Sequence, residues 1–236
     1  MEPSQRRSDG LPPDFDADIS QILAQVRDFT MTSPLNVFAL CNAVEYITRH
    51  GIRGAVVESG VWRGGSMMAA ALTLLRLGDT SRDLVLFDTF DGMPQPAAGD
   101  VKYSGDAAIP RWERERRGTG SLWCFAALDE VRRNLGGTGY PASRIHYEQG
   151  NVEATLPSHA PDEIAILRLD TDFYASTRAE MEHLFPRLVP GGVLIVDDYS
   201  HWQGCRRAVD EYLERTRIPL MLCRIDDGAR IAVKPR

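Results

Sequence analysis

Residues 55–66 read Ala-Val-Val-Glu-Ser-Gly-Val-Trp-Arg-Gly-Gly-Ser. The apolar run that ends at Glu58 predicts a buried strand, and the apolar stretch Ser66–Leu77 predicts the helix that follows it. Gly60 permits a tight turn between the two, and the glycine pair that begins at Gly64 lets backbone N–H groups approach a ligand closely. The stretch therefore predicts a strand, a ligand-binding turn and a helix.

Short apolar runs continue to alternate with helical patterns on the C-terminal side of this unit. Further strands are expected at Leu84–Asp88, Arg144–Tyr147, Ile164–Leu169 and Gly192–Val196. Further helices are expected at Leu128–Leu135, Ala179–Leu188 and Ala208–Arg215. The segments Leu220–Arg224 and Arg230–Val233 resemble a closing antiparallel hairpin. Strands that alternate with helices predict an α/β fold, with a doubly wound, mainly parallel sheet of the Rossmann-like type and an antiparallel closing strand.

The N-terminal region predicts two helices that precede the sheet. Residues 1–15 have little apolar content and are expected to form a mobile tail before a helix at Ile19–Phe29. Ser33 and Pro34 predict the start of the second helix, because serine caps helices and proline suits the first turn. Residues 16–236 are therefore expected to form a single domain.

The stretch Met93–Cys124 fits neither the helical nor the strand period. It contains prolines, glycines and the charged run Arg111–Arg117. Long insertions of this kind in compact domains are usually functional lids or disordered segments. We interpret it as a lid over the ligand-binding edge of the sheet, with a plain surface excursion as the alternative.

Composition excludes several classes of protein. The chain has 236 residues, a formal net charge of -6 and a pI of about 5.4, which disfavours nucleic acid and anionic membranes as partners. No stretch approaches the roughly 20 apolar residues of a membrane span, and a signal peptide is not evident, so a cytoplasmic protein is expected. The scattered cysteines fit neither a zinc site nor a disulfide framework, and we expect free thiols.

Three loops are expected to meet at the carboxyl edge of the sheet, where ligands bind in doubly wound folds. They are the turn after Glu58, the strand end at Asp88 and the turn at Gly150. The dinucleotide glycine pattern is absent, and Glu58 would repel a pyrophosphate, whereas it suits the cationic methionine end of S-adenosylmethionine. We expect this cofactor to contact Glu58, Gly60, Trp62, Arg63, Gly64, Ser66, Asp88, Gly150, Val152 and Asp170.

Four aspartates follow two neighbouring strands of the predicted sheet. Asp170 and Asp172 come after Ile164–Leu169, and Asp197 and Asp198 come after Gly192–Val196. Carboxylates that meet at one edge repel one another unless protons, arginines or a cation compensate. An all-oxygen set suits Mg²⁺, Mn²⁺ or Ca²⁺. We assign Asp170, Asp197 and Asp198 as metal ligands and Asp172 as the general base that receives a substrate hydroxyl proton.

Other roles for these acids stay open at this point. They could cap helices that start near Ser176 and Ser200, although capping needs only one residue per helix. Arg168 and Arg206 could neutralise part of their charge. Lys102, in the insertion, is the one lysine that could replace Asp172 as the base if the insertion reaches the site.

Several motifs of the chain resemble the macrocin O-methyltransferase (TylF) family. They are the turn Glu58–Gly65, the run Phe87–Pro94, Gly150–Pro157, Leu169–Tyr174, and Pro190–Gly192 leading to Asp197–Tyr199. The motifs occur in the family order between about residues 30 and 215. One departure is Asn151, where many members have an aromatic residue.

The resemblance implies Mg²⁺-dependent transfer of a methyl group from S-adenosylmethionine to a deoxysugar hydroxyl of a natural product. The acceptor would be a finished glycoside or a sugar nucleotide, and members commonly form homodimers or larger homo-oligomers. The resemblance places Asp170, Asp197 and Asp198 on the metal, Asp172 as the base, and Glu58 and Asp88 on the cofactor.

Two other classes of function are weighed against the methyltransferase. A nucleotide-dependent sugar oxidoreductase would need a phosphate-binding glycine triplet and a Tyr/Lys pair, and neither is evident. A non-catalytic cofactor-binding partner would not need four aspartates that repel one another, so the intact acidic cluster argues against this class.

Overall fold

The computed structural model describes residues 11–235 and centres on a seven-stranded sheet in the order β5-β2-β1-β6-β7-β9-β8. Its strands are β1 (Ala55–Ser59), β2 (Leu84–Asp88), β5 (Ile145–Gln149), β6 (Ile164–Leu169), β7 (Leu188–Val196), β8 (Cys223–Arg224) and β9 (Arg230–Val233). The five strands from β5 to β7 are parallel, and β9 and β8 are antiparallel. The predicted α/β class with its antiparallel closing strands is confirmed.

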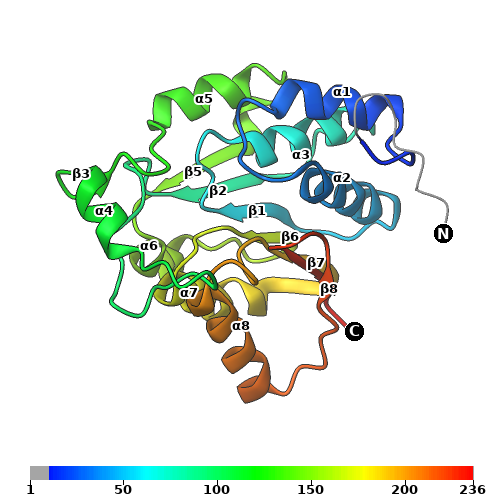
Figure 1. Ribbon diagram of the computed structural model, residues 1–236. Helices are drawn as coiled ribbons and strands as arrows, with labels where there is room; N and C mark the ends of the chain where they lie inside the picture. The colour runs from blue at the N-terminus through cyan, green and yellow to red at the C-terminus, as the bar shows by residue number, and fades with distance from the viewer. Residues whose placement is uncertain (1–10, 236) are drawn as a thin grey trace.

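Helices cover both faces of this sheet (Figure 1). One face carries α1 (Ala17–Val26), α2 (Pro34–Arg49), α3 (Gly65–Arg76) and α5 (Leu128–Gly136). The other carries α6 (Val152–His159), α7 (Tyr174–His183) and α8 (Gln203–Thr216). Short 3-10 turns lie at Ala142–Arg144 and Phe185–Arg187. Each face buries its own hydrophobic cluster, so the sheet is enclosed as in other doubly wound folds. No helix among the described residues is long and apolar enough to cross a membrane.

Three helices outside the insertion differ most from the sequence prediction, and one of them, α8, begins at Gln203 rather than at Ala208. The helix α6 was not expected, because its eight residues carry little apolar periodicity, and the Asn151 side chain caps it by accepting a bond from the Glu153 N–H. The helix α7 begins at Tyr174 rather than at Ala179. Its first turn is polar, and the distant Asp100 carboxylate accepts the Tyr174 N–H at 3.2 Å, a partner that no local pattern reveals.

The end of the expected N-terminal tail is packed against the domain. Residues 1–10 lie outside the described part of the chain, but Phe15 is 1% exposed and stacks on Phe38 of α2 with 4.4 Å between ring centroids. The α2 helix begins as expected, with Ser33 as its cap and Pro34 in its first turn.

The insertion at residues 93–124 is structured. It contains α4 (Ile109–Glu115) and the small hairpin of β3 (Arg116–Arg117) and β4 (Gly120–Ser121). Trp112 and Trp123 are 4% exposed and pack into the cluster on the α7–α8 face. The Tyr103 N–H donates to the His201 carbonyl at 3.0 Å, which ties the insertion to the loop after β7.

Candidate active site

A cavity of about 510 Å³ lies at the carboxyl ends of β1, β2, β6 and β7. Its wall combines the turn after β1, the end of β2, the loops after β6 and β7, and the insertion. A cavity of this size is typical of a small-molecule site, and its position is the one that doubly wound sheets use. Eleven of the expected site residues line it: Glu58, Gly60, Trp62, Ser66, Asp88, Gly150, Val152, Asp170, Asp172, Asp197 and Asp198.

The register of the sheet decides which acids face one another. Glu58 of β1 lies beside Arg168 of β6, and Arg168 lies beside Ile195 of β7. Because side chains alternate along a strand, Asp170 and Asp197 continue the face of Arg168 and Ile195. Asp198, one residue further, turns to the opposite side.

A buried guanidinium joins the acids on the first of these faces. The Nη1 atom of Arg168 donates to Glu58 Oε1 at 2.6 Å and to Asp170 Oδ2 at 2.5 Å. Its Nη2 atom donates to Asp197 Oδ1 at 2.7 Å and to Thr32 Oγ1 at 2.8 Å. Arg168 is 1% exposed, so it is paired in the low-dielectric interior rather than in water. Arg168 therefore neutralises part of the charge of Asp170 and Asp197, as the sequence allowed. Arg206 instead pairs with Asp210 on the surface.

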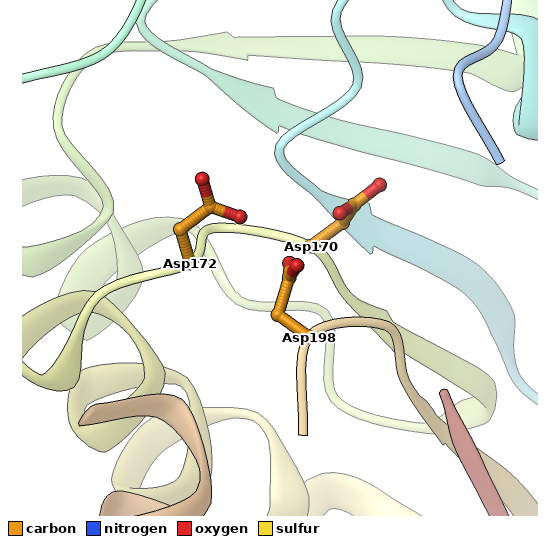
Figure 2. A group of neighbouring side chains, drawn as sticks. All are labelled: Asp170, Asp172 and Asp198. Atoms are coloured by element: carbon orange, nitrogen blue, oxygen red, sulfur yellow. The ribbon is translucent and has the colours of Figure 1, made fainter. Parts of the chain in front are cut away.

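Three carboxylates gather beside this arginine cluster. Asp170, Asp172 and Asp198 each place one oxygen so that all three oxygens lie within 4.8 Å of one another. Figure 2 shows two of them on the loop that follows β6 and the third on the loop that follows β7. Asp197, which the sequence analysis assigned to the metal, is not part of this trio, because its carboxylate accepts hydrogen bonds from Arg168 and from the Asn36 amide. Asp172 is the third member instead.

These acids are not helix caps. The residues that precede α7 and α8 are Phe173 and Trp202, and neither makes a side-chain capping bond. Burial and the neighbouring Asp198 and Asp170 carboxylates raise the pKa of Asp172 well above its usual value. Burial raises the pKa of Asp170 to about 6 and that of Asp197 to about 7, against the opposing effect of Arg168. The cluster therefore holds protons near neutral pH unless a cation replaces them.

The backbone around the cavity is strained. Asp172 has a φ of 67°, Trp62 a φ of 46° and Cys124 a φ of 52°, all in the left-handed region that residues other than glycine rarely adopt. These three residues line the same cavity. Strained residues of this kind persist where surrounding structure over-determines them, which is commonest at functional sites.

Glu58 and Asp88 line the cavity at the carboxyl ends of β1 and β2. Burial raises the pKa of Glu58 to about 8, and its Oε2 atom has no hydrogen-bond partner among the described residues. Asp88 Oδ2 accepts the N–H groups of Val61 and Trp62 at 2.7 and 3.1 Å, and its Oδ1 accepts the Phe90 N–H at 2.7 Å. Asp88 thus fixes the shape of the glycine-rich turn, a task that its sequence position did not reveal.

Two expected cofactor residues do not line the cavity. The Arg63 side chain pairs with Glu130 of α5 at 2.6 Å and donates to the Asp28 carbonyl at 2.6 Å. A methyl group added to Gly64 would lie 2.6 Å from the Leu135 side chain. Both residues therefore pack the turn against α5 and the N-terminal segment.

Gly60 separates the cofactor turn from the acidic loop, and we expect alanine there to be strongly destabilising. Its φ is +78°, and an added methyl group would lie 2.0 Å from the Asp170 carbonyl oxygen. The left-handed conformation alone costs about 1–2 kcal/mol for alanine, and the backbone overlap adds to that. Urea unfolding of Gly60→Ala measures the loss. Gly136→Ala is the matched control, because Gly136 is helical with open space around it, and it should be neutral or stabilising by up to about 1 kcal/mol. Equal stability of the two variants would contradict the close approach.

Sequence reasoning missed one contributor to the acidic cluster, Asn36. Asn36 is 2% exposed on the apolar face of α2, where a polar residue among Val37 and Leu40 is a detectable signal of a buried partner. Lys102 and Arg111 of the insertion line the cavity, so the insertion does reach the site, which was the condition for a role of Lys102.

The sheet order, the glycine-rich first turn and the acidic strand ends around one cavity define a Rossmann-like methyltransferase. The chain belongs to the macrocin O-methyltransferase (TylF) family, whose profile matches residues 24–232. The predicted family and the predicted O-methyltransferase activity are thereby confirmed.

Individual relatives agree with this assignment. The chain is 37% identical over 183 residues to the 8-demethyl-8-(2,3-dimethoxy-alpha-L-rhamnosyl)-tetracenomycin-C 4'-O-methyltransferase of Streptomyces olivaceus. The aligned region covers 78% of this chain and 67% of the relative. It is 30% identical over 197 residues to the mycinamicin III 3''-O-methyltransferase of Micromonospora griseorubida, with 84% and 75% covered. The solved structure of the O-methyltransferase NovP matches with a TM-score of 0.78 at 30% identity, over 88% of this chain and 83% of that one.

Proposed function

We propose that the protein transfers a methyl group from S-adenosylmethionine to a deoxysugar hydroxyl of a glycosylated natural product, with the help of a divalent cation. The observation that carries this proposal is the carboxylate trio of Asp170, Asp172 and Asp198 in the same cavity as Glu58. The names of two relatives, which refer to a rhamnosyl 4' position and to a 3'' position, support a sugar hydroxyl as the acceptor.

The residues around Glu58 fit S-adenosylmethionine. The unpartnered Oε2 of Glu58 is a buried acceptor that faces the cavity, and the ammonium group of the methionine part is a donor of the matching charge. Gly60 and Ser66 of the adjacent turn line the same cavity. When bound, the cofactor supplies an electrophilic methyl group on a sulfonium centre.

The trio fits a divalent cation. Its donors are all carboxylate oxygens, and the Oδ2 atom of Asp198 is buried without a hydrogen-bond partner among the described residues. Asp170 and Asp198 are our proposed ligands; Asp197, a ligand in the sequence-based proposal, is held by Arg168, which also donates to Asp170. When bound, Mg²⁺ or Mn²⁺ would lower the pKa of a coordinated sugar hydroxyl.

Asp172 then has the position of the general base. Its carboxylate would accept the hydroxyl proton as the sugar oxygen takes the methyl group, which would leave a neutral thioether and a protonated Asp172. Burial and the neighbouring carboxylates raise its pKa, and a bound cation would offset part of that rise and keep the carboxylate ionised for proton transfer. Glu58 and the trio, which are joined through Arg168, would orient the two reactants side by side in one enclosed space.

The alternative classes have less support. The turn after β1 lacks the glycine triplet that a nucleotide-dependent oxidoreductase uses for a pyrophosphate. An inactive cofactor-binding partner would not need an acidic trio whose members raise one another's pKa.

Mass spectrometry of reaction products tests the proposed function. The protein is incubated with S-adenosylmethionine and a panel of rhamnosyl and related deoxysugar glycosides, with Mg²⁺ or with a chelator. We expect a product heavier by one methyl group only when Mg²⁺ is present. Undiminished methylation after complete chelation would contradict the metal role, and the absence of methylation across glycosides and sugar nucleotides would contradict the activity.

A further inference from the structure

A second cavity, of about 380 Å³, adjoins the candidate active site. Four residues line both cavities: Lys102, Arg111, Trp123 and Trp202. The rest of its wall comes from the first turns of α4 and the segment just before it. The insertion therefore builds a chamber that is continuous with the wall of the acceptor site.

The charges in this second cavity are opposite to those of the acidic trio. Its wall contains three cations, Lys102, Arg111 and Arg114, and one acid, Asp106. Asp106 already accepts the Ser104 hydroxyl at 2.7 Å, and Arg111 pairs with Glu115 at 3.0 Å. Lys102 and Arg114 make no ion pair with any residue between 11 and 235. The chain as a whole has a net charge of -6, so this local excess of positive charge is not a consequence of composition.

The two indole rings of the shared wall hold the cations in place. The Arg111 Cζ lies 4.3 Å from the Trp123 ring centroid, and the Lys102 Nζ lies 5.2 Å from that of Trp202. Trp123 is 4% and Trp202 3% exposed, so little aromatic surface is left for a ligand to stack on. The wall offers nitrogen donors rather than an aromatic platform.

We propose that this second cavity binds an anionic oxygen group of the acceptor, while the sugar reaches the acidic trio. The proposal rests on the proposed function, because it specifies the acceptor. The second cavity orients such a substrate, since Lys102 and Arg114 attract its anionic end. The anionic group is the diphosphate of a nucleotide-linked deoxysugar or an ionised phenol or carboxylate of an aglycone.

Calorimetric titration of the full-length protein with inorganic pyrophosphate in a chelator at pH 8 tests the anion site without any turnover. We expect one saturable site, and Arg114→Gln combined with Lys102→Met should weaken it by about tenfold or more, because hydrogen bonds between charged groups are lost. Arg133→Gln is the matched control, since Arg133 is exposed on α5 and lines neither cavity, and it should bind pyrophosphate like the wild type. No binding by the wild type, or equal weakening by the control, would overturn the proposal.

Kinetics with three acceptors then identify the source of the anion. Arg114→Gln should raise the KM for a nucleoside diphosphate sugar or for a glycoside with an ionised aglycone, whichever is the substrate, and leave the KM of a neutral alkyl glycoside unchanged. An equal rise for the neutral glycoside would overturn the proposal. Pyrophosphate binding that behaves as expected in a protein without methyl transfer would contradict only the proposed function.

Discussion

Asp172→Asn should lower kcat by about 10²- to 10⁴-fold, the usual contribution of a general base, with cofactor affinity unchanged. The amide is nearly isosteric but cannot take a proton from the sugar hydroxyl. It also removes one charge from a crowded acidic trio, so the variant should fold at least as well as the wild type. Steady-state kinetics and calorimetric titration with S-adenosylhomocysteine separate the two effects.

Asp129→Asn is the matched control for this experiment. The Asp129 side chain is 80% exposed on α5, outside the cavity, so the same chemical change should leave turnover as it is. Asp172→Asn with kcat within a few-fold of the wild type would remove Asp172 from the mechanism. In that case Lys102, which lines the cavity with its ammonium beside the Trp202 ring, becomes the candidate base, and Lys102→Met should abolish turnover.

Arg168→Met should lower the free energy of unfolding by about 3–5 kcal/mol, the typical cost of removing one partner from a buried ion pair. The Glu58, Asp170 and Asp197 carboxylates would lose their shared counterion in a water-poor interior. The cost should shrink as the pH falls from 8 towards 5. Without the arginine the folded-state pKa values of these acids rise further above their unfolded values, so protonation at lower pH removes the repulsion. Urea unfolding at several pH values measures the change against the wild type.

Arg133→Met controls for the loss of an arginine, because Arg133 is exposed and makes no ion pair within residues 11–235. It should cost little at any pH. If Arg168→Met does not fold, adding Glu58→Gln and Asp197→Asn should restore folding, since the unpaired charges are then gone. A loss of stability below about 1 kcal/mol, or one that does not depend on pH, would contradict the role of Arg168 as the shared counterion of the three carboxylates.

Much of the fold was predictable because hydrophobic periodicity is local. Strands β2 and β6 match their predicted bounds, and the start of α2 follows from Ser33 and Pro34. The start of α7 was not predictable, because the Asp100 carboxylate that binds its first N–H lies 74 residues away in the insertion. Periodicity carries no information about such distant partners.

The candidate site was predictable at the level of the sheet edge but not of individual contacts. The parallel strands bring Glu58, Asp170 and Asp198 together, as their positions at strand ends predict. The separation of Asp197 from Asp198 follows from strand alternation, which could have been applied to two consecutive residues. The left-handed backbone of Asp172, which places this residue beside Asp198, is set by tertiary packing and has no signature in the sequence.

Titration of the protein with Mn²⁺ tests most directly whether acids from two neighbouring strand ends form a cation site. We expect the wild type to bind one Mn²⁺ per chain, more tightly at pH 8 than at pH 6, because the ion must displace protons from acids of raised pKa. Asp198→Asn should weaken binding by at least about tenfold, whereas the exposed Asp129→Asn should not change it. A wild-type protein that takes up no Mn²⁺, or an Asp198→Asn variant that binds it as tightly as the wild type, would contradict the account.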